Sequence, residues 1–184
     1  DPPIFTGSVY SFMGDERRAV YEYLVRRGDV RIFGSPRRIL RGGLSSNIYL
    51  ALNPVHRIRG REYIEAIMRA RFGVGASAFQ DARHYSSDRL SHYLSLGTLY
   101  LCHRFAGCED LFTDHEHLVY FNNIDDLAGK MDYYLENPEE AARIAAAGMK
   151  KMNTEYNTER MVRMMLDIIE TGASAMFPWV EIYS

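Results

Sequence analysis

The sequence predicts an α/β fold with one doubly wound parallel sheet of about five to six strands and additional helices at the C-terminus. Two observations carry this prediction. Short apolar runs alternate with helical patterns of about 10 to 15 residues, the arrangement of crossover units between parallel strands. The chain has 184 residues, of which 47% are hydrophobic, enough for the core of one globular domain.

The N-terminal part is predicted to form a strand, a helix and a second strand. The first strand is the apolar run from Ile4 to Gly7. The helix starts at the capping residue Asp15, and its apolar residues recur at helical spacing. Val30 to Phe33 is the second strand. Between Arg37 and Arg59 the pattern offers only one candidate strand, Asn47 to Leu52.

The rest of the chain continues the alternation and ends in three helices. The predicted elements are a helix at Arg61–Arg71, a strand at Phe72–Ala76, a helix at Asp88–Leu96, a strand at Leu99–Cys102, a helical turn at Glu109–Phe112, a strand at Leu118–Phe121, and helices at Asp125–Glu136, Pro138–Met152 and Glu155–Thr171. Pro138 in a first helical turn and Gly172 after a last turn are the residues expected at such boundaries.

Charge and composition exclude several classes of function. Lysine and arginine number 22 against 24 aspartates and glutamates, a net charge of −2, so we expect no binding to nucleic acid. Cys102 and Cys108 fit neither a zinc site nor a disulfide framework. No transmembrane segment is expected, because no apolar run approaches about 18 residues. The opening Asp1-Pro2-Pro3, without a leader, predicts a cytoplasmic piece of a longer protein.

Ligands of open parallel sheets bind beyond the carboxyl ends of the strands, so the residues that follow each strand are the candidates. Gly7 follows the first strand and would let a backbone approach a phosphate closely, although a simple tight turn explains it equally well. The three-glycine dinucleotide fingerprint is absent, and the second strand ends at Gly34 rather than at an acidic residue. Nicotinamide chemistry is therefore disfavoured.

A second candidate is the loop that enters the helix at Asp88. The helix N-terminus presents unpaired N–H groups beside Ser87, and Arg89 could grip a diphosphate with two hydrogen bonds. In the alternative interpretation, Ser87 only caps the helix and Arg89 pairs with Asp88 or solvent. No metal is expected, since His115-Glu116-His117 has no third ligand and the sequence contains no Asp-x-Asp motif.

Several segments together resemble the C-terminal domain of GT-B glycosyltransferases, in particular the group named after the spore-maturation protein CgeB. The segments are Ser87-Asp88-Arg89 to Gly97, the turn Gly107-Cys108-Glu109-Asp110-Leu111-Phe112, the helices around Asp125-Asp126-Leu127 and Tyr134–Glu140, and the first strand and loop at Ile4–Ser8 with Arg17 or Arg18. The resemblance covers most of Ile4 to Gly172. It implies a Rossmann-like domain that forms one half of a GT-B fold.

This resemblance implies a domain that binds a nucleotide-diphosphate sugar, the donor in sugar transfer. Arg89 would contact the diphosphate, the backbone near Gly7 and Ser8 would approach it, and Arg17 would add charge. Glu109, with Gly107, would line the sugar or phosphate side of the cleft. The implied nucleotide-sugar-binding residues are Gly7, Ser8, Arg17, Ser87, Arg89, His92, Gly107 and Glu109; no catalytic residue is assigned.

Two positions depart from the family pattern. His92 stands where relatives carry a glutamate that binds the ribose, and His84, eight residues earlier, stands at the acidic position of many retaining relatives. Histidine can donate to a hydroxyl or a phosphate, but it cannot act as a carboxylate. The substitution fits a specialised or an impaired enzyme. In the alternative interpretation, His92 is a helix residue that faces solvent.

The predicted organisation is a nucleotide-sugar-binding domain at residues 1–172 and an apolar tail at 173–184. The tail holds the only tryptophan, Trp179, and is expected to pack on a missing N-terminal domain, or else on its own domain or a second copy. The predicted function is metal-independent and cofactor-independent transfer of a sugar to a saccharide, lipid or protein acceptor, with poor activity for this fragment alone. The alternative is a non-catalytic α/β binding or assembly module, either a degenerate transferase or flavodoxin-like.

Overall fold

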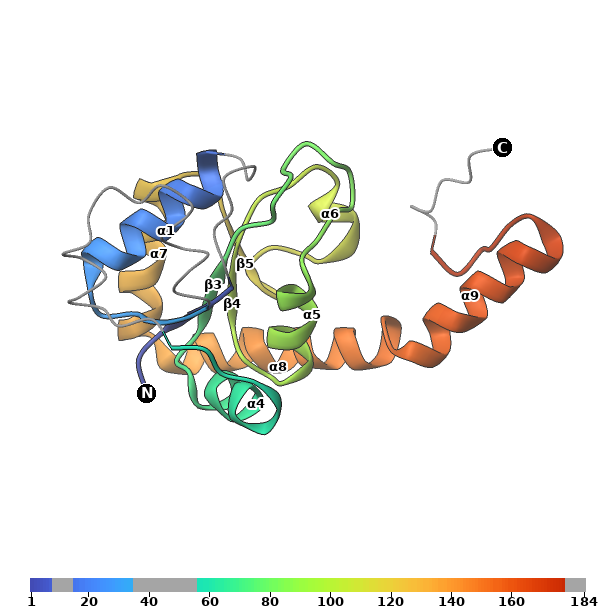
Figure 1. Ribbon diagram of the computed structural model, residues 1–184. Coiled ribbons are helices and arrows are strands. Elements are labelled where there is room, and N and C mark those ends of the chain that lie inside the picture. Colours follow the sequence, from blue (N-terminus) through green and yellow to red (C-terminus); the bar gives the residue numbers. More distant parts are fainter. Residues whose placement is uncertain (8–14, 35–55, 178–184) are drawn as a thin grey trace.

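The computed structural model describes residues 1–7, 15–34 and 56–177. In this part of the chain five parallel strands form one sheet in the order β2-β1-β3-β4-β5 (Figure 1). The strands are β1 Ile4–Thr6, β2 Arg31–Phe33, β3 Gly73–Gly75, β4 Tyr100–His103 and β5 Val119–Phe121. The helices are α1 Asp15–Arg27, α4 Gly60–Arg69, α5 Asp88–Ser95, α6 Cys108–Leu111, α7 Ile124–Glu136, α8 Pro138–Glu155 and α9 Thr158–Thr171.

The sheet is buried on both faces. Successive strand residues point to opposite sides, and every residue of β1, β3, β4 and β5 is buried. One row of paired residues crosses the whole sheet and faces the core under α1 and α7; it consists of Ile32, Phe5, Val74, Leu101 and Val119. The residues next to them, such as Ile4 and Tyr100, face a second core under α4, α5 and α6. The two helical layers lie on either side of the sheet in Figure 1.

Two glycines in β3 leave room for a pair of tyrosines, Tyr93 of α5 and Tyr100 of β4. A Cβ on Gly73 would overlap the ring of Tyr93, and a Cβ on Gly75 would overlap the hydroxyl of Tyr100. The two tyrosine rings stack at 5.0 Å, and the Tyr93 hydroxyl donates to Oγ1 of Thr6 at 3.1 Å. This packing fixes α5 against β1 and β3, with its N-terminus at the carboxyl edge of the sheet.

The last helix, α9, extends away from the sheet (Figure 1). Its exposed apolar residues recur at intervals of three and four and form one stripe: Val162, Met165, Leu166 and Ile169. Beyond α9 the chain returns, and the ring of Phe177 stacks on Tyr156 at 5.3 Å. Tyr156 in turn packs on Phe112 at 5.2 Å. Among the described residues of this end, the stripe on α9 therefore exposes large apolar side chains to solvent.

The predicted fold class is confirmed, and each described strand lies within or beside a predicted one. Boundaries differ slightly at the C-terminus, where α8 continues to Glu155 and α9 begins at Thr158 because Asn157 caps it. The candidate strand at Asn47–Leu52 and the residue Trp179 lie outside the described residues. Within those residues, no helix combines the length and the apolar character needed to cross a bilayer.

Candidate functional site

The strand order places a topological switch point between β1 and β3. From β1 the chain first forms β2 on one side, and it later forms β3, β4 and β5 on the other side. Ligands of doubly wound sheets bind beyond the carboxyl ends of the strands that flank such a point. Gly7 follows β1, Ala76 follows β3 and Arg104 follows β4. The candidate site is therefore this carboxyl edge.

Arg89 lies at the switch point and joins the two strand ends. It is the second residue of α5 and only 8% exposed. Nη1 donates to the carbonyl oxygen of Thr6 at 2.9 Å, and Nη2 donates to that of Ala76 at 3.0 Å. Nε donates to the hydroxyl of Ser87 at 3.2 Å. Two of the five guanidinium N–H groups have no partner among the described residues.

A second guanidinium meets Arg89 at the same carbonyl. Arg17 of α1 is 4% exposed, and its Nη1 donates to the oxygen of Ala76 at 3.1 Å. Gly7 lies against both groups, with a φ of +136° that favours glycine. A Cβ at this position would overlap Nη1 of Arg89 and lie 3.0 Å from Nη2 of Arg17. Gly7 therefore fits because the two arginines occupy the space that a side chain would need.

In the described part of the chain, the hydrogen-bond partners of Arg89 are all neutral. Its hydrogen-bond partners are two carbonyls and a hydroxyl, and its guanidinium carbon lies 5.8 Å from the centre of the Phe5 ring. A buried charge without a counter-charge is costly, so such a site attracts an anion. The N-terminus of α5 adds unpaired N–H groups and the positive end of the helix dipole.

The loop that leads into α5 is attached to the neighbouring turn before α6. Gly107 begins this turn with a φ of +74°, and a Cβ there would lie 2.6 Å from Cδ2 of His84. Nε2 of His84 lies 2.7 Å from Oδ2 of Asp110, and its backbone N–H donates to Ala106 at 2.8 Å. Hydrogen bonds from His84 and from Arg83 hold the pKa of the Asp110 carboxyl below its ordinary value.

Glu109 is an exposed carboxylate in the first turn of α6, which begins directly after Gly107. Its side chain is 65% exposed and lies 2.5 Å from Nη1 of Arg104. The backbone N–H of Glu109 and contacts with Cys108 and Arg104 hold the pKa of this carboxyl below its ordinary value, so the group is ionised at neutral pH. Glu109 thus brings a fixed negative charge to the part of the edge that follows β4.

The remaining predicted residues have mixed placements. His92 is exposed on α5, and its Nδ1 lies 3.0 Å from the hydroxyl of Tyr63 on α4. Ser87 precedes α5, but its side chain makes no capping hydrogen bond and accepts from Arg89 instead. Ser8 lies outside the described residues. The structure thus brings Gly7, Arg17, Ser87 and Arg89 together in one cluster.

Sequence reasoning missed three groups that build the edge. The carbonyls of Thr6 and Ala76 bind the arginines, and Arg104 binds Glu109. Backbone carbonyls leave no signal in a sequence, because every residue has one. The sequence did indicate Arg104 as a candidate. It follows the predicted strand Leu99–Cys102 closely, and ligands bind beyond the carboxyl ends of such strands.

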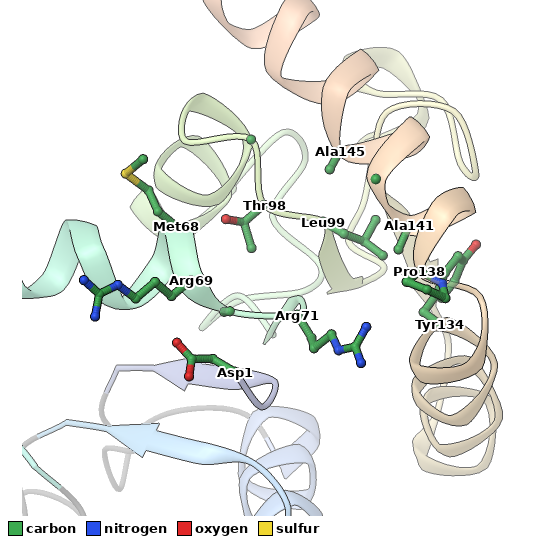
Figure 2. A pocket seen from close by; sticks show the side chains of 13 residues that line it. Asp1, Met68, Arg69, Arg71, Thr98, Leu99, Tyr134, Pro138, Ala141 and Ala145 are labelled. Carbon is green, nitrogen blue, oxygen red and sulfur yellow. The ribbon is translucent and has the colours of Figure 1, made fainter.

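A cavity of about 410 Å³ lies at the opposite edge of the sheet. Figure 2 shows it between Asp1, Arg71 at the end of the α4–β3 connection, Leu99 before β4, and Ala141 of α8. Asp1, Arg71 and Leu99 precede β1, β3 and β4, so the cavity is remote from the switch point. Across the described ranges, no three His, Cys, Asp or Glu side chains are grouped so that they could hold a metal ion.

The fold is that of the C-terminal half of a GT-B glycosyltransferase. Residues 17–167 match the model of a family described as glycosyl transferase-like, and the chain belongs to this family. No curated protein sequence matches the chain. The finer likeness to the CgeB group stays a prediction.

Solved structures share this fold at low sequence identity. HepE of Anabaena, in complex with UDP-glucose, superimposes with a TM-score of 0.70 at 11% identity over 91% of this chain and 48% of HepE. Sucrose-phosphate synthase of Thermosynechococcus elongatus gives 0.68 at 14% identity, over 92% of this chain and 45% of the synthase. The chain spans about half the length of these proteins.

An isolated domain is also similar. The C-terminal domain of a group 1 glycosyl transferase, LpcC of Francisella tularensis, superimposes with a TM-score of 0.55 at 13% identity, over 85% of this chain and 87% of that one. The chain therefore corresponds in extent to one domain of such a protein.

Proposed function

We propose that this chain is the donor-binding half of a glycosyltransferase and holds a nucleotide-diphosphate sugar at the carboxyl edge of β1 and β3. The observation that carries the proposal is the buried guanidinium of Arg89, whose described hydrogen-bond partners are all neutral. The diphosphate would supply the missing negative charge. Arg17 would add a second positive charge, and the backbone at Gly7 and Ser8 would approach the phosphates.

The same groups would assist the chemical step, in which the bond between the sugar and the diphosphate breaks. Negative charge grows on the departing diphosphate, and Arg89 with the N-terminus of α5 is placed to stabilise it without reorganisation. This arrangement needs no metal ion. Gly107 and Glu109 would line the sugar side, and His92, engaged with Tyr63, would donate to a ribose hydroxyl or a phosphate.

The acceptor, a saccharide, lipid or protein, would bind mainly to a further domain. Two observations support this: the chain spans about half of HepE, and α9 exposes its apolar stripe, with Ile169 78% exposed. A stripe of this kind is typical of a surface that another domain covers. The chain alone would then bind the donor weakly and transfer little sugar.

A thermal-shift panel of UDP, GDP, ADP, TDP and CMP on the full-length protein, with and without chelator, tests the proposal. We expect one diphosphate to raise the melting temperature independently of chelator, because ligand at about 100 times its Kd stabilises the folded state by about 2.7 kcal/mol. Arg89→Ala should abolish this shift.

A matched control separates lost binding from lost stability. Thr98 is also buried and donates its hydroxyl to a backbone carbonyl, that of Ile67, at the opposite edge of the sheet. Thr98→Val should destabilise the fold and keep the nucleotide shift. If no nucleotide shifts the wild-type protein, or if Arg89→Ala keeps the shift, the donor site proposed here is wrong and a non-catalytic binding module becomes the better interpretation.

A further inference from the structure

Arg104 joins two acidic side chains at the carboxyl edge of β4. Its Nη1 lies 2.5 Å from Oε1 of Glu109, and its Nη2 lies 2.8 Å from Oδ2 of Asp114. Its guanidinium carbon lies 5.0 Å from the centre of the Tyr120 ring. One planar cation therefore spans from the first turn of α6 to the loop before β5, with an aromatic ring against it.

The two ends of this bridge differ in rigidity. Asp114 is anchored, because its Oδ1 accepts the backbone N–H of Tyr120 at 2.8 Å, and the Tyr120 hydroxyl donates to the carbonyl of Cys108 at 2.8 Å. The Asp114 side chain is 28% exposed, whereas that of Glu109 is 65% exposed. Glu109 is therefore the end that a ligand can reach, and Arg104 connects it to the fixed end.

The charge of this group differs from that at the switch point. Arg104, Glu109 and Asp114 carry one positive and two negative charges, a formal sum of −1, whereas Arg89 brings a positive charge with neutral partners. A carboxylate repels a diphosphate but accepts hydrogen bonds from neutral hydroxyls. The charge pattern therefore suits a ligand with an anionic part over β1 and β3 and a hydroxyl-bearing part over β4 and α6.

The two parts of the edge are close enough for one ligand. β4 pairs directly with β3, and adjacent strands lie about 4.8 Å apart. The turn before α6 is also packed on the loop that enters α5, through the contact of Gly107 with His84. A ligand held at the N-terminus of α5 can thus extend over this turn toward Glu109.

We propose that Arg104 is a positioning residue that holds the Glu109 carboxylate in place to accept hydrogen bonds from the hydroxyls of the donor's sugar. The inference rests on the proposed function. It adds that Glu109, held by Arg104, recognises the sugar and not the diphosphate. Arg104 contacts Glu109 rather than the sugar. Its loss should therefore weaken binding of the sugar conjugate and leave binding of the bare nucleoside diphosphate unchanged.

Calorimetric titration of the full-length protein measures this difference. UDP, GDP and ADP are titrated first, and then the glucose, galactose and N-acetylglucosamine conjugates of the diphosphate that binds tightest. In Arg104→Met we expect the affinity for the tightest conjugate to fall about fivefold to tenfold, and that for the bare diphosphate to stay within about twofold. Glu109→Gln should reproduce this pattern.

The double variant tests whether Arg104 acts through Glu109. Arg104→Met combined with Glu109→Gln should bind the conjugate no more weakly than Glu109→Gln alone, because the carboxylate that Arg104 positions is already gone. Arg27→Met is the matched control. Arg27 also bridges two carboxylates, Asp29 at 2.8 Å and Asp132 at 2.6 Å, but it is the last residue of α1, whereas Arg17 of the candidate site lies near the start of this helix. It should change neither affinity.

The outcomes separate this inference from the proposed function. If no diphosphate binds, or if binding does not depend on Arg89, the proposed function fails and this inference fails with it. If a diphosphate binds through Arg89 but the wild-type protein does not prefer any conjugate, or Arg104→Met weakens both ligands equally, only this inference is overturned. Additive losses in the double variant would overturn the positioning role of Arg104.

Discussion

Arg89 and Arg104 lie on the same edge of one sheet, but together with their partners they give it net charges of opposite sign. Arg89 is buried and bonded to carbonyls and a hydroxyl, so its positive charge remains uncompensated within the described residues. Arg104 faces two carboxylates, so its surroundings carry a net negative charge. The partners of an arginine, and not the arginine itself, therefore decide what kind of ligand a site attracts.

The same difference separates their contributions to stability. Removal of Arg89 would leave the buried carbonyl of Thr6 without this donor, while the carbonyl of Ala76 would keep Arg17, and an unsatisfied buried polar group costs about 1 to 3 kcal/mol. Removal of Arg104 would break two ion pairs whose side chains are between 28% and 65% exposed, and exposed pairs contribute about 0 to 1 kcal/mol. Arg89 is thus structural as well as a candidate ligand contact.

The largest effect is expected from Gly7→Ala. The added methyl group would overlap Arg89, and alanine disfavours a φ of +136°. Urea unfolding should show a loss of about 3 kcal/mol, and diphosphate affinity should fall because the guanidinium groups must move. Gly129→Ala in α7 is the control: its Cβ meets nothing within 4 Å, and alanine favours a helix by up to about 1 kcal/mol.

Such an outcome would support the close packing of the switch point. Wild-type stability in Gly7→Ala would instead show that Arg89 does not occupy the space beside Gly7. The contrast with Arg104 would then lose its structural basis, because the burial of Arg89 depends on that packing.

A direct comparison of Arg89→Met and Arg104→Met should give the next largest effect. We expect Arg89→Met to lower the free energy of unfolding by about 1 to 3 kcal/mol, because the buried Thr6 carbonyl loses this donor, whereas the Ala76 carbonyl keeps Arg17. Arg104→Met should lower it by less than about 1 kcal/mol. Urea titrations at one pH and one salt concentration measure both, and equal losses would contradict the distinction between a buried tether and a partly exposed ion pair.

The fold was predictable from the sequence because the sheet is buried on both faces. Each strand must then be a short apolar run, such as Leu99 to Cys102, and each run ends at a glycine or a polar residue where the chain leaves the core. The helices carried equally local signals, such as Pro138 in the first turn of α8. Local patterns were sufficient for two reasons. A helix makes its hydrogen bonds within itself, and the spacing of apolar residues along a helix or a strand determines which of its faces is buried.

The site was predictable only in part, because its contacts join residues far apart in the chain. The position of Arg89 at a helix N-terminus marked it as a candidate, but its bond to Thr6 crosses 83 residues and ends on a carbonyl that any residue could supply. The bridge from Arg104 to Glu109 and Asp114 follows no helical or strand spacing. The contact of His84 with Gly107 depends on left-handed backbone at both residues, which no spacing rule reveals.

The smallest predicted effect concerns pH and Glu109. The backbone N–H of Glu109, together with Cys108 and Arg104, lowers the pKa of its carboxyl in the folded state. A lowered folded-state pKa stabilises the fold above the unfolded-state value of about 4.3, and this stabilisation is lost as the pH falls through the folded-state pKa. Glu109→Gln lacks this carboxyl and cannot lose the stabilisation, so the variant should be less stable than wild type at pH 7, and the difference should shrink as the pH falls toward 3.

Urea unfolding at both pH values measures the difference, which should be below about 1 kcal/mol because the side chain is largely exposed. Arg104→Met serves as the internal check, because it removes one of the groups that favour the ionised carboxylate. In that background the pH dependence assigned to Glu109 should shrink. If the pH dependence persists in full, the backbone N–H and Cys108 lower the pKa of Glu109 without help from Arg104. Arg104 would then bind Glu109 without changing its pKa.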